Sequence, residues 1–180
     1  MVVSQFGDVE GADEVAAALA AAAYPMPWRS QAEKGPAPAA LVYAIARRES
    51  GFDARALSPA GALGLMQLMP ETIAKLALPG ETLPSLDEIL DPKTNLSFGS
   101  LYLAKLMERF PTAAATAAAY NAGEDRVELW LKSFSPATER EFVAMIPYEE
   151  TRLYTERVLL DYRRYQELLA AEGGVRDPAR

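Results

Sequence analysis

Glu49 is the residue best placed for acid–base chemistry in this sequence. It lies near the end of a helix predicted over residues 38–50 and, at about 100° per residue, falls in the middle of that helix's apolar face. The apolar face comprises Leu41, Val42, Ile45 and Ala46. A carboxyl group at the end of a buried stripe is partly desolvated, which favours its neutral form. A neutral carboxyl near pH 7 can protonate a leaving group.

Helical spacing leaves a second interpretation of Glu49 open. The residue sits at a helix end, before the stop formed by Ser50-Gly51, and could bend out into water. There it would be able to pair with the neighbouring Arg48, which would lower the pKa of the carboxyl and oppose an acid role. The position on the helix therefore favours the acid role without deciding it.

The composition restricts the chemistry that the chain can use. The 180 residues contain no cysteine and no histidine, which excludes disulfides, thiolate nucleophiles, histidine triads and metal sites built on Cys or His. General acid–base work is left to carboxylates, Lys or Tyr. The net charge is −7 without a basic cluster, which argues against nucleic acid as a partner. No apolar run approaches the ~20 residues of a membrane-spanning helix, and we expect neither a metal nor a cofactor.

The pattern of apolar and helix-capping residues predicts an all-α fold. Helices are expected over residues 11–23, 38–50, 70–78, 85–90, 92–110, 113–121, 124–133, 137–146 and 149–171. Residues 53–69 contain Ser58-Pro59, Gly61 and Gly64, which predict a loop with at most a small hairpin. We divide the chain into an N-terminal helical extension over residues 1–23, one domain over 24–172 and a polar tail over 173–180.

A series of short motifs occurs along the chain. They are Glu49-Ser50-Gly51-Phe52, residues 56–62 (ALSPAGA), residues 64–70 (GLMQLMP), Asp91-Pro92 with Asn95 and Gly99, residues 119–123 (AYNAG), Ile146-Pro147-Tyr148, and Glu150-Thr151-Arg152 with Tyr154. In this order and spacing the set resembles the SLT domain of soluble lytic transglycosylases, which are relatives of goose-type lysozyme. The resemblance covers residues 24–165 and implies a lysozyme-like α fold.

The resemblance implies roles for Glu49 and for three residues of the 53–69 loop. Glu49 would be the single catalytic acid and base. Ser58 would line the cleft near the scissile sugar and help to position its N-acetyl group or the catalytic carboxylate. Met66 and Gln67 would form the cleft floor and hydrogen-bond N-acetyl sugars. Without the other motifs, Met66 would be interpreted as core filler, the commoner use of methionine.

The C-terminal half adds three residues that the resemblance implies to be substrate-binding. Tyr120 and Asn121 would face Glu49 across the cleft, with Tyr120 close to the reacting sugar. Glu150 would shape the site or contact the peptide-bearing side of the substrate. In isolation, Tyr120-Asn121 is also typical of a helix end, and Glu150 is typical of the first turn of a helix.

The activity that the resemblance implies is lytic cleavage of peptidoglycan. The enzyme would cut the β-1,4 bond between MurNAc and GlcNAc and leave 1,6-anhydro-MurNAc ends, with the N-acetyl group of the substrate taking the place of a second carboxylate. Its partner would be the glycan strand of peptidoglycan, in the periplasm or cell envelope, and we expect a monomer. Residues 1–10 lack the features of a signal peptide.

Two alternatives to this lyase activity remain. A lysozyme-type hydrolase would need a second carboxylate or a held water opposite Glu49. The candidate carboxylates are Glu150, Asp53 and Glu124. A glycan-binding or scaffold module would keep the fold and lack turnover. The sequence also departs from the family after Gly123, where Glu124-Asp125 stands in place of a glycine-rich stretch and adds two negative charges near the cleft.

Overall fold

The computed structural model describes residues 15, 18–19, 22–78, 80 and 82–174. Within them the helices are α2 (Arg29–Lys34), α3 (Ala39–Glu49), α4 (Pro70–Leu76), α5 (Leu86–Leu90), α6 (Pro92–Arg109), α7 (Ala113–Ala122), α8 (Glu124–Phe134), α9 (Glu139–Met145) and α10 (Glu149–Gly174). Between α3 and α4, two isolated antiparallel bridges join Leu57 to Leu63 and Leu63 to Leu68. The described part of the chain is otherwise helices and loops, which confirms the predicted all-α fold class.

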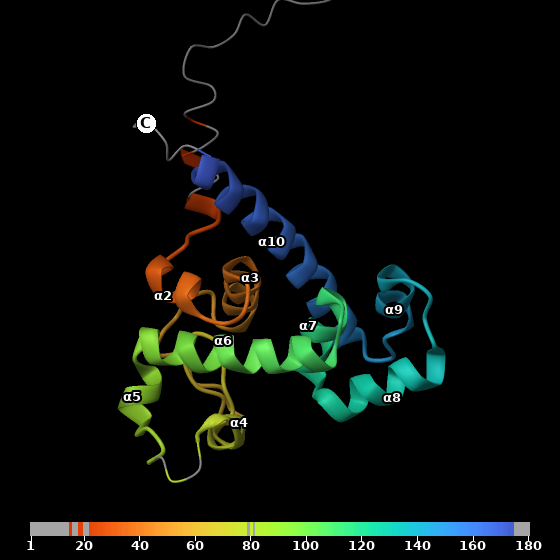
Figure 1. The fold of residues 1–180 in the computed structure, drawn as a ribbon, viewed down its shortest axis with the longest axis horizontal. Helices are drawn as coiled ribbons and strands as arrows, with labels where there is room; N and C mark the ends of the chain where they lie inside the picture. The colour runs from red at the N-terminus through yellow and green to blue at the C-terminus, as the bar shows by residue number, and fades with distance from the viewer. Residues whose placement is uncertain (1–14, 16–17, 20–21, 79, 81, 175–180) are drawn as a thin grey trace, which may run out of the picture.

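The helix α10 crosses the molecule beside α3 and α7 (Figure 1). The helix α6 runs across the face nearest the viewer and packs against α3 and α7. The short α4 and α5 lie near one end of α6, whereas α8 and α9 lie toward the other end, next to α7. The helix α10 therefore packs against both α3 and α7, which come from earlier parts of the chain.

The helix starts follow capping residues in the sequence. Ser85 and Glu88 form a capping box before α5, in which the Glu88 carboxylate accepts from the Ser85 N–H at 2.7 Å. Asp91 Oδ1 accepts from the N–H of Thr94 at 3.0 Å at the start of α6. Thr112 caps α7. Because each cap satisfies N–H groups that lack a helical partner, it fixes where the helix begins.

The boundaries differ from the prediction at α2, α4, α9 and α10, and α9 begins at Glu139 rather than at residue 137. The sequence does not predict α2, because the residue before it, Trp28, has a left-handed backbone with φ of 51° and no side-chain cap hydrogen bond. The helix α4 ends at Leu76, and α10 continues to Gly174, two residues into the predicted tail. Most of the expected helix over 11–23, and residues 175–180 of the tail, lie outside the described residues.

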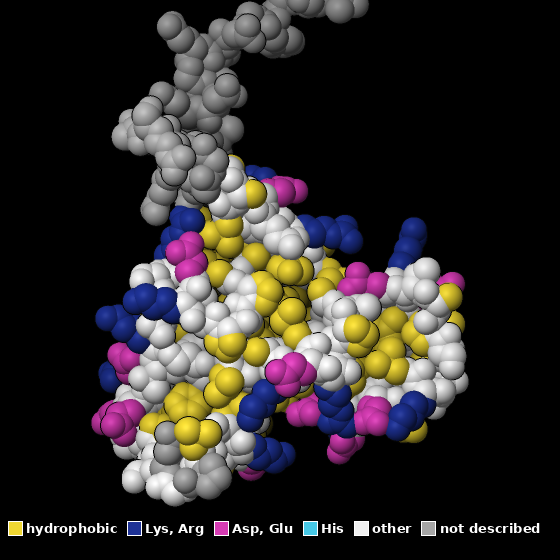
Figure 2. All heavy atoms as spheres, viewed as in Figure 1, with side chains coloured by type: hydrophobic (Ala, Val, Ile, Leu, Met, Phe, Trp, Pro, Cys, Tyr) yellow, Lys and Arg dark blue, Asp and Glu magenta, His cyan; other side chains and the backbone are white. Residues whose placement is uncertain are grey.

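The core consists of two clusters of buried side chains. The larger surrounds α3, in which residues 40–46 are all buried. The second lies around α7 and includes Trp130 of α8 and Phe142 of α9. Figure 2 shows hydrophobic side chains gathered in the middle of the visible face, with most charged side chains toward its rim. The last residue of α3 is Glu49. Because the helix before it is buried, the position of the Glu49 backbone is fixed.

Candidate active site

Glu49 is partly exposed and stands where α3 packs against α10. The hydroxyl of Tyr154 on α10 donates a hydrogen bond to Glu49 Oε1 at 2.5 Å. Burial raises the pKa of the Glu49 carboxyl from 4.5 to about 7, although the Tyr154 hydrogen bond acts in the opposite direction. The structure therefore supports the desolvated carboxyl that helical spacing predicts.

The alternative in which Arg48 pairs with Glu49 is wrong. Arg48 Nη2 lies 2.6 Å from the carboxylate oxygen Oδ2 of Asp161 on α10. Arg47 Nε lies 3.6 Å from the same oxygen, and its Nη1 donates to the carbonyl of Ala23 at 2.6 Å. In the described part of the chain neither guanidinium forms an ion pair with Glu49, so the positive charge that would lower its pKa is held elsewhere.

Tyr120 of α7 joins the helices to the 53–69 loop. Its hydroxyl donates to the carbonyl oxygen of Met66 at 2.7 Å, and its ring packs against Tyr102 with centroids 5.3 Å apart. Burial, followed by the charge of Glu49, holds the phenol pKa of Tyr120 well above its ordinary value. The phenol therefore stays neutral, and its interaction with Glu49 supports the predicted placement of Tyr120 near the acid.

Met66 lies beneath the surface of the cleft. Its side chain is 0% exposed and packs against Gly99 of α6. A Cβ atom on Gly99 would lie 2.0 Å from Met66 Sδ, so only glycine leaves room for the methionine. The predicted contact between the Met66 side chain and a sugar is therefore corrected. This side chain fills the core, as methionine commonly does, and the carbonyl of Met66 accepts the hydrogen bond of Tyr120.

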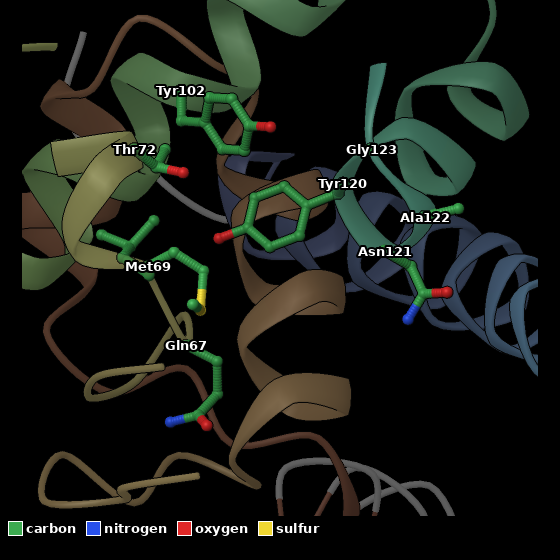
Figure 3. Close-up of a pocket in the computed structure, with 9 residues that line it drawn as sticks. Gln67, Met69, Thr72, Tyr102, Tyr120, Asn121, Ala122 and Gly123 are labelled. Atoms are coloured by element: carbon green, nitrogen blue, oxygen red, sulfur yellow. The ribbon is translucent and has the colours of Figure 1, made fainter. Parts of the chain in front are cut away.

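A cavity of about 290 Å³ opens beside Tyr120 (Figure 3). Its lining residues are Gln67, Leu68, Met69, Thr72, Tyr102, Tyr120, Asn121, Ala122 and Gly123. Figure 3 shows Tyr102 and Tyr120 close together on one side of Met69, with Gln67 toward the opposite end and the Asn121 side chain directed away from Tyr120. Aromatic and apolar walls with a few placed polar groups are the usual composition of a ligand site.

Asn121 also lines a second cavity, of about 310 Å³. The hydroxyl of Thr151 donates to Asn121 Oδ1 at 2.7 Å and so fixes the orientation of its side chain. The other lining residues are Arg47, Arg48, Glu150, Leu153, Tyr154 and Arg157. Two residues implied by the family resemblance, Asn121 and Glu150, therefore share a cavity with Tyr154, the hydrogen-bond partner of Glu49.

Gln67 and Ser58 hold the 53–69 loop in shape. Gln67 has φ of 46°, and its Nε2 donates to the carbonyls of Ala56 at 3.1 Å and Gly64 at 2.8 Å. Because both amide hydrogens are used, its Oε1 is the atom left to accept from a ligand. Ser58 Oγ accepts from the N–H of Ala62 at 2.9 Å, and Ser58 lines neither of these two cavities. The contact of Ser58 with substrate stays a prediction.

Arg109 of α6 forms ion pairs with Glu124 and Asp125. Arg109 Nη1 lies 2.6 Å from Glu124 Oε2, and the same guanidinium pairs with Asp125 at 3.7 Å and with Glu128. Glu124 and Asp125 also stand in the first turn of α8, where the helix dipole favours negative charge. Gly123, with φ of 91°, turns the chain directly from α7 into α8. The single charge of Arg109 is shared with Glu128, so it offsets only part of the negative charge that the sequence adds near the cleft.

A comparison with known families covers most of this arrangement. The family model of the transglycosylase SLT domain matches residues 26–143, which include Glu49, the 53–69 loop and Tyr120. The chain belongs to the SLT domain family. The matched region begins shortly before α2 and ends in α9, so α10, which carries Tyr154 and Asp161, follows it along the chain.

Relatives of this SLT domain are longer proteins. The chain is 39% identical over 128 residues to the soluble lytic murein transglycosylase of Escherichia coli K12, a match that covers 68% of the chain and 20% of the relative. It is 42% identical over 130 residues to the putative soluble lytic murein transglycosylase of Haemophilus influenzae, with 70% of the chain and 22% of the relative covered. The chain thus spans about a fifth of the length of these curated relatives.

Solved structures of SLT proteins show the same fold. The 70-kDa soluble lytic transglycosylase in complex with bulgecin A superposes with a TM-score of 0.76 and 33% identity, covering 83% of this chain and 26% of that one. An inactive glutamate-to-glutamine mutant of lytic transglycosylase Slt from Pseudomonas aeruginosa superposes with a TM-score of 0.73 and 34% identity. The match covers 82% of this chain and 25% of that one. This similarity confirms the predicted lysozyme-like α fold.

Sequence reasoning misses Tyr154 as a site residue, although Tyr154 closes the last motif. It lies 105 positions from Glu49 in the chain, so spacing along one helix carries no sign of their contact. The available signal is that Tyr154 follows Glu150 by four residues and therefore stands on the same face of α10. Tyr102 is missed for the same reason, since its partner Tyr120 comes from another helix.

If Glu49 acts as a general acid, replacing Tyr154 by phenylalanine should lower the rate of the reaction and shift its pH dependence. The hydroxyl holds Glu49 in place and stabilises its charged form, so its loss should reduce the rate about tenfold and raise the pKa of Glu49 above about 7. Rates of cleavage measured from pH 5 to 9 would show both effects. The control is Tyr162→Phe on the same helix. Equal effects of the two variants would contradict a role for the Tyr154 hydroxyl.

Proposed function

We propose that this SLT domain is a lytic transglycosylase that cuts the β-1,4 bond between MurNAc and GlcNAc in peptidoglycan, with residues 24–172 as its catalytic domain. The observation that carries the proposal is the Glu49 carboxyl, whose pKa is raised to about 7 at the junction of α3 and α10. Such a group is able to give a proton and then to take one back near neutral pH. The relatives bear the name lytic murein transglycosylase, which supports the same reaction.

The first step breaks the glycosidic bond. The neutral Glu49 gives its proton to the oxygen that links MurNAc C1 to GlcNAc, and that C1–O bond breaks. The carbonyl oxygen of the MurNAc N-acetyl group bonds to C1 as the bond breaks, which forms an oxazolinium ion. GlcNAc leaves with its hydroxyl restored, and Glu49 remains as a carboxylate. The substrate therefore supplies the internal nucleophile that a second carboxylate supplies in other retaining glycosidases.

The second step closes a ring. The Glu49 carboxylate takes the proton of the MurNAc 6-hydroxyl, and that oxygen attacks C1. The bond from C1 to the N-acetyl oxygen breaks, which restores the N-acetyl group and leaves a 1,6-anhydro ring. Glu49 is neutral again, and no water is consumed. Tyr120 and the Oε1 atom of Gln67 border the cavity beside Tyr120 and are the polar groups we assign to sugar binding there.

The carboxylates that a hydrolase would need are placed as follows. Glu124 is paired with Arg109 at 2.6 Å. Asp53 accepts from the N–H of Arg55 at 2.9 Å on the exposed loop. Glu150 lines the cavity that contains Tyr154 and is the remaining candidate. An enzyme that works with Glu49 alone depends on the N-acetyl group of the substrate, so the chemical form of the product separates the two reactions.

Digestion of purified peptidoglycan followed by mass spectrometry tests the proposal. We expect disaccharide products that end in 1,6-anhydro-MurNAc, each lighter by one water than the corresponding reducing sugar. Reducing MurNAc ends would instead show a lysozyme-type hydrolase. An absence of soluble products, with the protein still sedimenting with the insoluble peptidoglycan, would show a glycan-binding module without turnover.

The activity should be lost as the pH rises through about 7. Glu49 must be protonated to start the reaction, and a carboxyl with a pKa of about 7 is half protonated at neutral pH. A carboxyl with its ordinary pKa would be protonated in roughly 0.3% of molecules there. We therefore expect the rate to fall about tenfold for each pH unit above 7. An upper limb of the pH–rate profile near pH 5 would contradict the raised pKa.

We place this reaction at the cell envelope, where peptidoglycan is found. Other proteins to which this chain is similar bear the name membrane-bound lytic murein transglycosylase. Among the helices that the structure describes, none is both long and apolar enough to span a membrane. The proposed partner is the glycan strand itself, bound by a monomer, without a metal or cofactor in either chemical step.

A further inference from the structure

One face of α10 is aligned with α3 along its whole contact. Tyr154, Asp161 and Tyr165 stand seven and four residues apart, a spacing that places them on one side of a helix. Tyr154 contacts Glu49, Asp161 contacts Arg48, and the ring of Tyr165 packs against Tyr43 at 5.2 Å. The order of partners along α3 is reversed relative to α10, so the two helices are antiparallel. Each of these three residues of α10 therefore contacts a different residue of α3.

Asp161 is a buried carboxylate in that row. The residue is 1% exposed, and its Oδ2 atom lies 2.6 Å from Arg48 Nη2 and 3.6 Å from Arg47 Nε. Arg47 is also held by the carbonyl of Ala23 at 2.6 Å and by the ring of Tyr24, 4.5 Å from its guanidinium carbon. Within the described residues, the ion-pair partner of Arg48 is Asp161. Arg48 therefore depends on Asp161 for its position.

Glu49 has several titratable or charged groups around it. Tyr120 from α7 and Tyr154 from α10 interact with it directly. The cavity that Tyr154 lines is also bordered by Arg47, Arg48, Glu150 and Arg157, and Asp161 pairs with the two arginines of α3. The loop between α3 and α4 contributes no charged side chain to the two cavities among the described residues. Of the cations, Arg48 is the neighbour of Glu49 in the chain, and its charge already acts on Tyr154, the hydrogen-bond partner of Glu49. Arg48 is thus the cation best placed to change the acid.

The burial of the Asp161 carboxylate needs a reason other than stability. Desolvation of this carboxylate offsets much of its attraction to the partly exposed arginines, and well-packed apolar residues often serve a protein equally well. The neighbours of Asp161 on α10, Val158 and Tyr165, are apolar or aromatic and fully buried. An apolar residue at position 161 would satisfy the same packing and would leave Arg48 without its counter-charge. The carboxylate is therefore needed for the arginine rather than for the core.

We infer that Asp161 is a positioning residue, whose buried carboxylate binds the Arg48 guanidinium and so leaves Glu49 with Tyr154, rather than a cation, as its partner. The inference rests on the proposed function, because it concerns the proton that Glu49 delivers. Without Asp161, the freed guanidinium would be attracted to the nearest carboxylate, and the charged form of Glu49 would be favoured. Asp161 thereby sets the pH range in which the acid is protonated.

The pH–rate profile of Asp161→Asn tests this inference in the full chain, with release of products from peptidoglycan as the rate. A downward shift of one pKa unit would lower the ratio of the rates at pH 7.5 and pH 5.5 about sixfold relative to the unmodified protein. Adding Arg48→Gln to this variant should restore the original ratio, and Asp161→Glu, which keeps the charge, should retain it. A uniform loss of rate at every pH, with the upper limb unmoved, would show a purely structural residue and overturn the inference.

A second measurement covers the case in which Asp161→Asn does not fold. Urea unfolding at pH 8 of Arg48→Gln, Glu49→Gln and the double variant reports whether Arg48 interacts with Glu49. If Asp161 holds the guanidinium, the two changes should alter the unfolding equilibrium constant independently, within a factor of about two. A tenfold or larger coupling would show that Arg48 pairs with Glu49 and would overturn the inference. This measurement needs no activity, so it separates a failure of the inference from a failure of the proposed function.

Discussion

The Glu49→Gln variant is expected to lose peptidoglycan cleavage by about a thousandfold, within the usual range for removal of a general acid and base. Glutamine keeps the shape of the side chain and can still accept the hydrogen bond of Tyr154, but it has no proton to give to the glycosidic oxygen. Release of soluble fragments from purified peptidoglycan measures the loss. Retention of more than a tenth of the activity would show that another group supplies the proton.

The free energy of unfolding of the same variant should be higher than that of the unmodified protein at alkaline pH. Measuring this gain would also show that the variant is folded. The pKa of Glu49 is raised from 4.5 to about 7 in the folded protein, so the folded state holds this proton more tightly than the unfolded state. Stability from this group is therefore complete below pH 4.5 and is lost as the pH rises through about 7. Because Glu49 is partly exposed and screened, we expect Glu49→Gln to be more stable by about 2 kcal/mol at pH 8. At pH 4.5 the two proteins should unfold at nearly the same urea concentration.

Binding of peptidoglycan by Glu49→Gln shows whether the variant has lost only proton transfer or has also lost the shape of its binding cleft. The residues that line the two cavities are unchanged in Glu49→Gln, so the variant should still sediment with insoluble peptidoglycan to the same extent as the unmodified protein. A variant that is stable and binds but does not cleave would assign the proton transfer to Glu49. The Pseudomonas aeruginosa relative with glutamine in place of a glutamate is described as an inactive mutant, which is a precedent for the loss of activity.

The fold is predictable from the sequence where the signals are local. Ser85, Asp91 and Thr112 each cap the helix that they predict, because a cap and its N–H partner lie within three residues of one another. The six-residue α2 is not predictable in this way. Its preceding residue, Trp28, is not a capping residue, and the helix is held by packing against α3 and α6. A segment that owes its structure to distant partners carries little local pattern.

The site is predictable only in part, for a related reason. The apolar face of the 38–50 helix locates Glu49, since that argument needs one helix alone. Arg48 pairs with Asp161 rather than with Glu49, and Asp161 is more than a hundred positions away on α10. Met66 fills the core rather than touching a sugar because Gly99, on α6, opens a space for its sulfur atom. Interactions between helices decide these outcomes, and a single sequence does not display them.

Asn95 connects the loop beside the acid to the helical core. Its side chain is fully buried on α6, where its Oδ1 accepts from the N–H of Met66 at 2.8 Å. Its Nδ2 donates to the carbonyls of Leu63 at 3.0 Å and Ile89 at 3.1 Å. One amide thus satisfies three buried backbone groups from two segments. Gly64, with φ of 71°, allows the close approach, because a Cβ there would lie 2.5 Å from Asn95 Nδ2.

Replacing Asn95 by alanine should lower the free energy of unfolding by about 3–5 kcal/mol, because three buried backbone groups lose their partner and a cavity remains. That is a large part of the ~5–15 kcal/mol that stabilises a typical domain. Urea unfolding measures the change, and Ser97→Ala, an exposed position on the same helix, should shift it by less than about 0.5 kcal/mol. Activity below the unfolding transition should also fall, since Met66 carries the carbonyl that accepts from Tyr120. A loss of stability no greater than that of Ser97→Ala would mean that the loop is held by its own turns rather than by Asn95.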